Sequence, residues 1–157
     1  CITAHSFYNE LSRGIPVPII HGIRETVEIL KNNGVRRAGI MATDGTIHSC
    51  LFQHELEEVG ITPVVPIKLF QDYIMELIYN CVKSNKPVNM VRFSEASAHL
   101  KDNGAEAIIL GCTELSLIKR DYQIDPGYLD VMEVLAGASI LKSQGKLRRD
   151  IKLLELV

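Results

Sequence analysis

The sequence predicts an α/β fold in which helices cover the faces of a mainly parallel β-sheet. Helical and strand-like segments alternate along the chain, and the two clearest strands, Arg36–Ala42 and Ala105–Gly111, are built around continuous apolar runs. Strands of this kind are buried on both faces, which is typical of parallel sheets flanked by helices. Each strand leads into a small polar turn. We therefore expect a repeated architecture in which a ligand binds beyond the carboxyl ends of the strands.

The amino-terminal half is expected to alternate helices with short strands. Ile23–Asn33 is predicted to be helical because its apolar residues repeat at helical spacing and Gly34 follows as a stop signal. The expected elements are, in order, a helix over Thr3–Ser12, a strand over Val17–Ile20, a helix over Ile23–Asn33, a strand over Arg36–Ala42, a turn over Thr43–Thr46, a helix over Thr46–Val59 and a strand over Pro63–Pro66.

The carboxyl-terminal half continues the alternation with longer helices. Leu69–Lys83 is predicted to be helical because its apolar residues gather on one side, and Gly104 stops the helix that follows. The expected elements are, in order, helices over Leu69–Lys83 and Val88–Asn103, a strand over Ala105–Gly111, a helix that begins near Thr113, a helix over Val131–Ser143 and an amphipathic end over Ile151–Val157.

Composition narrows the class of protein. The 157 residues are 46% hydrophobic and 23% charged, which is typical of a globular chain with a substantial core. The formal net charge of −2 leaves no basic excess for neutralising phosphates, so no nucleic-acid partner is expected. No apolar run approaches the roughly 20 residues that span a bilayer, and no signal-peptide pattern opens the chain, so we expect a cytoplasmic protein without a membrane partner.

The cysteine and histidine patterns argue against a metal site. The four cysteines lie about thirty or more residues apart and form no CxxC pair, which favours reduced thiols over a zinc knuckle or a disulfide framework. The five histidines show no ligand spacing with carboxylates or cysteines. A glycine-rich phosphate loop is also lacking, so the sequence predicts neither a metal nor a nucleotide cofactor.

Cys112 is the strongest candidate for chemistry because it lies where the clearest strand ends and a helix begins. Free backbone N–H groups and the positive end of a helix dipole favour the thiolate form of a cysteine in that place. The alternative is a structural cysteine that merely follows a strand, and position alone leaves both open. Cys50 and Cys81 fall inside predicted helices among apolar neighbours, where core packing is the better interpretation.

Two further segments carry weaker signals. Cys1-Ile2-Thr3-Ala4-His5 places a cysteine and a hydroxyl just before a helix, although a terminal cysteine can also be an accident of truncation. Thr43-Asp44-Gly45-Thr46 offers hydroxyls and a glycine turn that could hold a carboxylate, and its ordinary alternative is a helix N-cap supplied by Asp44 or Thr46.

Together these segments resemble the aspartate/glutamate racemase family, in particular its aspartate racemase branch. The resemblance rests on Cys1–His5, Ala42–Thr46 and the specific stretch Gly104–Leu115, which occur in order at suitable separations. It implies two similar three-layer α/β domains with mainly parallel sheets and an active site in the cleft between them. It covers about the carboxyl-terminal two-thirds of a family member, so we expect an incomplete first domain over 1–18 and 128–157 and a second domain over 19–127.

The resemblance also implies roles for individual residues. Cys1 and Cys112 are the expected catalytic thiols, which exchange protons at Cα without a cofactor. The expected substrate-binding residues are Thr3, Thr43, Gly45, Thr46, Lys83 and Thr113. Glu114 after the Cys-Thr pair favours the aspartate branch over glutamate racemases, which usually carry histidine there. The expected partners are an acidic amino acid and a second copy of the chain in a homodimer.

One departure keeps alternatives open. The family normally has asparagine after its first catalytic cysteine, whereas this chain has Ile2. The lost amide would contact the amino-acid head of the substrate, so a related isomerase or decarboxylase acting on another carboxylate remains an alternative to the racemase. A catalytically inactive carboxylate-binding fragment is the non-enzymatic alternative.

Overall fold

The computed structural model of the protein describes residues 2–148 and 152–156, and its centre is a four-stranded parallel β-sheet. The strands follow the order β2-β1-β3-β4 and comprise β1 (Arg37–Met41), β2 (Thr62–Val64), β3 (Ala107–Leu110) and β4 (Tyr128–Asp130). β1 pairs with both β2 and β3, so that Gly39 lies opposite Val64 on one side and Ile108 on the other. The predicted α/β class with a parallel sheet is confirmed.

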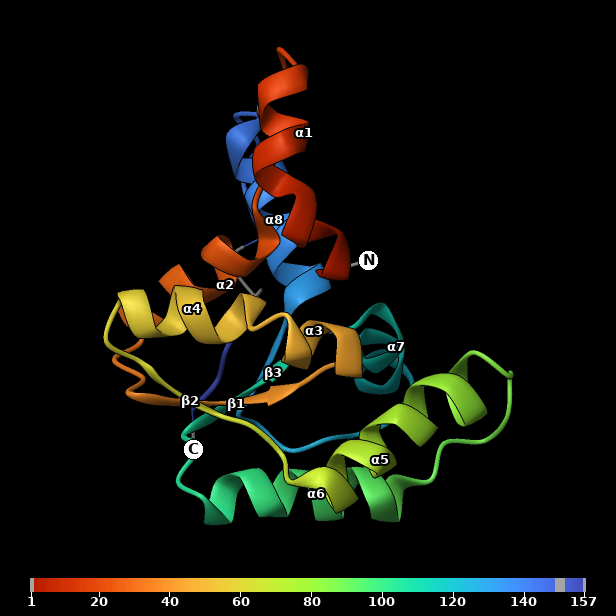
Figure 1. Cartoon of the computed structure of the whole chain (residues 1–157). Coiled ribbons are helices and arrows are strands. Elements are labelled where there is room, and N and C mark those ends of the chain that lie inside the picture. Colours follow the sequence, from red (N-terminus) through yellow and green to blue (C-terminus); the bar gives the residue numbers. More distant parts are fainter. Residues whose placement is uncertain (1, 149–151, 157) are drawn as a thin grey trace.

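One face of the sheet is covered by α2 (Gly22–Asn32) and α4 (Leu51–Glu58), which lie above the strands in Figure 1. Their apolar sides meet the sheet in one buried cluster that includes Ile23, Phe52 and the strand residue Ile40, each with no exposed surface. This packing confirms the helical spacing expected for Ile23–Asn33, and Gly34 takes a φ of 73° where α2 ends.

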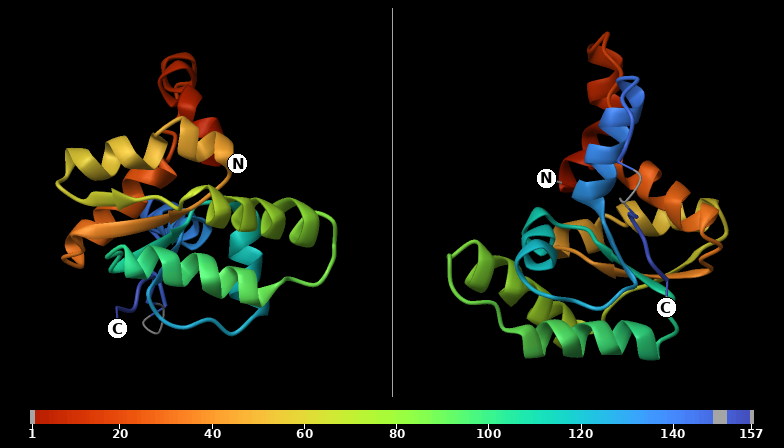
Figure 2. Two further views of the ribbon diagram at one scale, coloured as in Figure 1. Left: turned by 60° about the horizontal axis from the view of Figure 1, so that its bottom comes forward. Right: turned by 180° about the vertical axis from the view of Figure 1, so that it is seen from behind.

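The opposite face is covered by the helices that lie below the strands in Figure 1 and come forward in the left view of Figure 2. These are α5 (Lys68–Glu76), the π-helical turn η2 (Leu77–Val82) and α6 (Met90–Asp102), and α7 (Thr113–Asp121) packs into the same core. The two helical layers with the sheet between them form a three-layer α/β/α domain.

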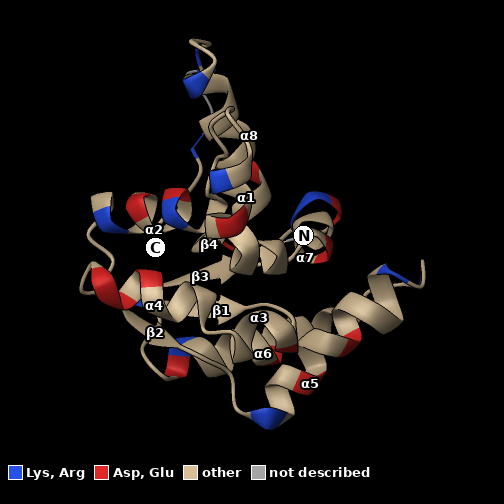
Figure 3. Cartoon of the chain, turned by 45° about the horizontal axis from the view of Figure 1, so that its top comes forward, with Lys and Arg blue, Asp and Glu red and all other residues tan. Residues whose placement is uncertain are grey.

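Four shorter or projecting segments complete the chain. They are η1 (Ile2–Phe7), α1 (Tyr8–Gly14), α3 (Asp44–His48) and α8 (Val131–Lys142). α1 and α8 project side by side away from the sheet in Figure 1 and in the right view of Figure 2. Figure 3 shows acidic and basic residues interspersed along the helices, and the formal net charge of the chain is −2. Within residues 2–148 and 152–156, no helix is long and apolar enough to cross a bilayer.

Two elements differ from those expected. Val17–Ile20 forms no strand, because the flanking and internal prolines lack the N–H groups that a sheet needs. Val17 is instead 65% exposed. β4 was not predicted, since three residues are too few to show a periodicity. The amphipathic end expected over Ile151–Val157 stays a prediction, because Ile151 and Val157 lie outside the described residues. Residues 152–156 between them form no helix or strand.

The helix predicted over Thr46–Val59 is two helices, α3 and α4. The break falls at Cys50, which has a left-handed φ of 52° and therefore ends one helical direction before the next begins. Cys50 is half-buried at this junction, so its assignment to the core is wrong. Cys81 in η2 is only 7% exposed, which confirms core packing for that residue.

Candidate functional site

The carboxyl ends of β1 and β3 meet at one edge of the sheet and place two predicted segments side by side. Met41 pairs with Leu110, and the Gly111 N–H donates to the Met41 carbonyl at 2.8 Å. The residues that follow each strand therefore face a common space. A cavity of about 170 Å³ lies there, lined by Ile2, Thr3, Thr43, Thr46, Tyr79, Lys83, Gly111, Cys112, Thr113 and Glu114.

Gly111 allows the second strand to approach the first closely. A Cβ atom at this position would lie 2.9 Å from Cε2 of Phe52 and 3.3 Å from the Met41 carbonyl oxygen. Both distances are too short for an unstrained contact, and the ring belongs to the buried core beneath α4. Only glycine therefore fits immediately before Cys112.

Cys112 occupies the N-cap position of α7 with an extended backbone, and its side chain is held by the helix that it precedes. The Sγ–H group donates to Oε2 of Glu114 at 2.8 Å, and the Thr113 hydroxyl donates to the same oxygen at 2.8 Å. Cys112 is 9% exposed, so little water competes for these contacts. The thiol lines the cavity as an ordered hydrogen-bond donor.

The surroundings of Cys112 favour the thiol over the thiolate. Burial, followed by the hydrogen bond to Glu114, raises the pKa of Cys112 to about 12, although the Lys83 charge acts in the opposite direction. Burial also works to raise the pKa of Glu114, but the hydrogen bonds from Cys112 and Thr113 outweigh it and leave that pKa below its ordinary value. The expected thiolate at the start of α7 is therefore not favoured, because desolvation and a neighbouring carboxylate outweigh the helix dipole.

Lys83 reaches the cavity from the end of η2. Its Nζ lies 3.7 Å from Oε1 of Glu114 and 4.2 Å from the centre of the Tyr79 ring, a cation–π contact. The π-helical turn brings Tyr79 and Lys83 to the same side, and turns of this kind are frequent at functional sites. Sequence reasoning missed Tyr79, and it used Glu114 only to place the chain within a family. The closeness in sequence of Tyr79 to Lys83 and of Glu114 to Cys112 is the signal from which both site residues could have been predicted.

A cluster of three threonine hydroxyls forms the other wall. Oγ1 of Thr46 lies 3.0 Å from Oγ1 of Thr3 and 3.1 Å from Oγ1 of Thr43. Thr43 takes the N-cap position of α3 without capping it through its side chain, so neither residue proposed as the cap fills that role. Gln71 steadies the turn, because its Nε2 donates to the Ala42 carbonyl at 3.0 Å.

The η1 segment that carries Thr3 is tied to the amino end of α2 through His5. Nδ1 of His5 lies 2.9 Å from the Ile2 carbonyl, and the Gly22 N–H donates to Nε2 at 3.0 Å. With Nε2 accepting, Nδ1 carries the proton and the ring is neutral. Burial lowers the pKa of His5, which favours the same neutral form.

Most of the predicted site residues therefore come together. The residues that line the cavity as expected are Thr3, Thr43, Thr46, Lys83, Cys112 and Thr113. Gly45 lies on α3 with its surface exposed and outside the cavity lining. Cys1 lies outside the described residues.

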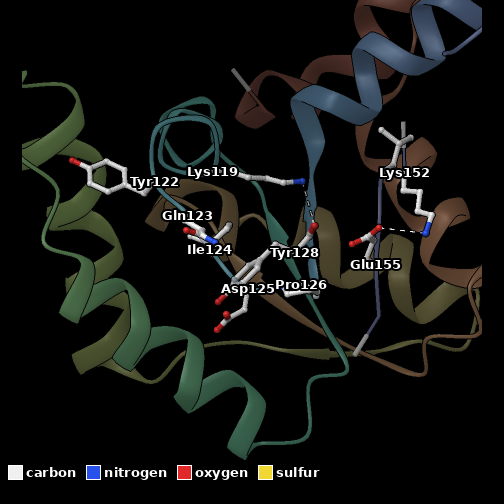
Figure 4. A pocket seen from close by; sticks show the side chains of 11 residues that line it. Lys119, Tyr122, Gln123, Ile124, Asp125, Pro126, Tyr128, Lys152 and Glu155 are labelled. Carbon is white, nitrogen blue, oxygen red and sulfur yellow. Dashed lines mark hydrogen bonds and ion pairs between the residues drawn. The ribbon is translucent and has the colours of Figure 1, made fainter. Parts of the chain in front are cut away.

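A second cavity, of about 310 Å³, lies near the amino end of β4 (Figure 4). Its lining includes Lys119, which lies 3.5 Å from the Tyr128 carbonyl, and the ion pair of Lys152 with Glu155 at 3.4 Å. The residues that line it include no cysteine and lie away from the carboxyl ends of the strands, so it lacks the chemistry of the first cavity.

Comparisons with known proteins show which family the chain resembles. Residues 1–139 match the profile of a family described as Asp/Glu/Hydantoin racemase. The chain is 26% identical over 145 residues to the broad specificity amino-acid racemase RacX of Bacillus subtilis, which covers 89% of this chain and 61% of that protein. It is 26% identical over 156 residues to the glutamate racemase of Aquifex aeolicus, which covers 97% of this chain and 55% of that protein.

Solved structures of proteins named as racemases share the fold. A Picrophilus torridus aspartate racemase superposes with a TM-score of 0.73 at 26% identity, over 96% of this chain and 62% of that one. A putative Asp/Glu racemase from Yersinia pestis, at 21% identity, shares the fold with a TM-score of 0.75. The chain thus spans about three-fifths of the length of RacX and of these solved structures. Because the family profile matches 139 of its 157 residues, the chain belongs to the Asp/Glu/hydantoin racemase family.

Proposed function

We propose that this chain acts as a cofactor-independent amino-acid racemase that moves a proton at Cα with two cysteine thiols. The observation that carries the proposal is the position of Cys112, whose thiol lies beyond β3 in a cavity also lined by threonine hydroxyls and Lys83. Family membership supports the reaction class. Aspartate is the proposed substrate and glutamate the second candidate, since the relatives include an aspartate racemase and a glutamate racemase.

The proposed reaction needs one acid–base group on each face of the substrate's Cα. A base removes the α-proton, and the opposite acid delivers a proton to the other face, so the stereocentre inverts without a bond between sulfur and substrate. Cys112 supplies one thiol. The family resemblance assigns the other to Cys1, and this assignment remains a proposal because Cys1 lies outside the described residues.

The other cavity groups are proposed to bind the substrate. The Cα–H group is a very weak acid, so preorganised hydroxyls and the amino-terminal amides of α7 must stabilise the charge that develops when it ionises. Lys83 offers an ammonium group to the side-chain carboxylate. The proposed substrate-binding residues are Thr3, Thr43, Gly45, Thr46, Lys83 and Thr113, with Gly45 acting through the turn that holds its neighbours.

The proposal extends to the organisation of the protein. We assign residues 1–18 and 128–157 to the remnant of a first domain and residues 19–127 to a second, with the cavity at their boundary, although β4 (Tyr128–Asp130) at the start of the second stretch pairs with β3 in the sheet of the second domain. The projection of α1 and α8 away from the sheet supports this division (Figure 1). A homodimer in the cytoplasm is the proposed assembly and location, by analogy with the family.

Ile2 favours a second candidate function. Its side chain is 4% exposed and lines the cavity, where it brings an apolar group next to the proposed position of the substrate head. A cavity with this wall suits an isomerase or decarboxylase that acts on a different carboxylate, or a binding module without catalysis.

Hydrogen exchange at Cα tests the proposed function. The protein is incubated in deuterium oxide with L-aspartate and, separately, with L-glutamate, while NMR follows the Cα–H signal and circular dichroism follows the optical activity. We expect deuterium at Cα together with loss of optical activity. Release of CO₂ or cis–trans isomerisation of another carboxylate would support the second candidate, and ligand binding without exchange would support the binding module.

Serine variants test the thiols within the same assay. Cys112→Ser and Cys1→Ser are each expected to lower the exchange rate by about 10²–10⁴-fold, because a positioned acid or base contributes about that much. Cys50→Ser is the matched control, since Cys50 lies at the junction between α3 and α4. Near-normal turnover in either of the first two variants would refute the two-thiol mechanism.

A further inference from the structure

The carboxylate of Glu114 makes three polar contacts at the cavity. Oε2 accepts hydrogen bonds from the Cys112 thiol and from the Thr113 hydroxyl, both at 2.8 Å. Oε1 lies 3.7 Å from Nζ of Lys83. The Glu114 side chain is 17% exposed, so these partners replace most of its water. Both oxygens are thereby held in place, and one of them is held against the thiol.

The charged and titratable groups around Cys112 come from three elements. Glu114 belongs to α7 itself, whereas Tyr79 and Lys83 reach the cavity from η2 and its end. Asp130 at the end of β4 is engaged with the amino end of α8 through the Met132 N–H. The cavity-lining residues of η1 are not titratable. Glu114 is therefore the carboxylate that faces the thiol.

The geometry of this pair distinguishes between the two protonation states of sulfur. A thiol at 2.8 Å from a carboxylate oxygen donates a hydrogen bond, as Cys112 does to Glu114. A thiolate at the same position would place two negative charges at that separation in a poorly hydrated site, where their repulsion is weakly screened. Lys83 offsets part of this repulsion from 3.7 Å, but on the far oxygen of the carboxylate.

We propose that Glu114 is a positioning residue that keeps the proton on Cys112, so that Cys112 is the proton donor of the resting site. The catalytic half of this inference, that Cys112 donates the proton during the reaction, rests on the proposed racemase function. The protonation half, that Glu114 keeps Cys112 in the thiol form, does not depend on that function. The resting protein is then ready for the enantiomer whose Cα–H bond points away from Cys112.

The base on the opposite face takes the α-proton, and the electron pair of the Cα–H bond stays on Cα. That pair then forms a new bond to the Cys112 proton, while the electrons of the S–H bond remain on sulfur as a thiolate. Repulsion from Glu114 disfavours this thiolate, so it regains a proton from water or buffer and the opposing base loses one before the next turnover of the same enantiomer.

Alkylation of individual cysteines tests the protonation half without substrate. The full chain is treated with iodoacetamide at a series of pH values, and mass spectrometry measures the rate at each cysteine-containing peptide. Since the thiolate is the form that reacts, the rate at Cys112 reports its ionisation. We expect Glu114→Gln to react at least about tenfold faster than the parent chain at pH 8, which corresponds to a shift of one pH unit in the midpoint.

Two variants separate charge from structure. Glu114→Asp keeps the carboxylate and is expected to return the Cys112 midpoint toward that of the parent chain. Glu57→Gln on the exposed side of α4 is the matched control and should leave the midpoint unchanged. An unchanged or higher midpoint in Glu114→Gln, in a chain whose buried Cys81 stays slow to react, would overturn the inference.

A kinetic measurement tests the catalytic half. If the chain racemises an amino acid, Glu114→Gln should move the alkaline limb of the kcat profile to lower pH for the enantiomer that takes its proton from Cys112, and should raise kcat near neutral pH for the enantiomer that gives its proton to Cys112. The same change in kcat for both enantiomers would contradict the donor assignment. If no amino acid exchanges its Cα proton, the proposed function fails, whereas the alkylation result still decides the protonation state.

Discussion

The two walls of the cavity are held in place by different forces. The Cys112 wall is the corner between β3 and α7, and it is anchored by buried apolar packing through residues such as Leu115 and Ile118, which have no exposed surface. The Thr3 wall is the short helix η1, in which Ile2 is the one buried residue. Hydrogen bonds through Thr3 and His5 fasten it to the rest of the domain.

This difference indicates which wall is rigid and which can yield. A buried apolar side chain contributes about 1.5–3 kcal/mol to stability, whereas one net hydrogen bond contributes about 0.5–1.5 kcal/mol. Elements that admit ligands are drawn from the less stable parts of a protein. We therefore expect η1 to open before the corner between β3 and α7 does, and three predictions test this contrast.

The largest effect is expected from Gly111→Ala at the packed wall. The added Cβ would lie 2.9 Å from the Phe52 ring and 3.3 Å from backbone, so the core must shift at a cost of about 1–3 kcal/mol in the free energy of unfolding. Urea denaturation measures this loss. Gly14→Ala in α1 is the control, because its Cβ would meet nothing within 4 Å, and an equal loss in both variants would mean that the corner is not tightly packed.

A smaller effect is expected from Thr46→Val at the hydrogen-bonded wall. Valine keeps the shape of this buried side chain but removes the hydroxyl that contacts Thr3 and Thr43. The expected loss is about 1 kcal/mol in the free energy of unfolding, with faster hydrogen exchange of the η1 amides. Thr62→Val on the exposed side of β2 is the control. Unchanged exchange in η1 would show that the hydroxyl cluster does not hold this wall.

The smallest effect is a pH dependence that originates at His5. Burial lowers the pKa of His5 in the folded chain, so the unfolded chain binds a proton first as the pH falls below about 6.5. The stability from neutral His5 is therefore present above that pH and lost below it. His21, which contacts His5 and whose pKa burial also lowers, acts in the same direction.

We expect His5→Gln to make the loss of stability between pH 7.5 and pH 5.5 shallower, with His21 responsible for the remaining slope. Urea denaturation at the two pH values measures the difference. His54→Gln on the exposed side of α4 removes a histidine without touching η1 and should keep the slope of the parent chain. A slope that is the same in all three proteins would rule out the contact between η1 and α2 as its source.

Sequence patterns predicted β1 and β3, two strands of the sheet that are buried on both faces. Arg36–Ala42 and Ala105–Gly111 were recognised because a strand buried on both faces consists of consecutive apolar residues, and they contain β1 and β3. The same rule failed at Val17–Ile20, where Val17 is exposed between two prolines and the two isoleucines are only half-buried. The helix expected over Thr46–Val59 failed at Cys50 for a different reason, because the residue type does not indicate a left-handed backbone.

The candidate site was predictable to the extent that it follows the strands. Thr43 and Cys112 come directly after β1 and β3, so a parallel sheet must bring them to one edge. Lys83 was assigned by resemblance alone. Tyr79 and the role of Glu114 escaped prediction because the π-helical turn that presents Tyr79 depends on how α5 and η2 pack against the sheet.

The sequence by itself determined that a cysteine stands at the end of β3 and at the start of a helix. Only the tertiary structure decided that this cysteine is a thiol. The helix dipole, which can be read from the sequence, favours the thiolate, but burial under distant segments and the conformation of Glu114 raise the pKa of Cys112 to about 12. Desolvation and the approach of a charge depend on residues far apart in the chain, so they exist only once the chain has folded.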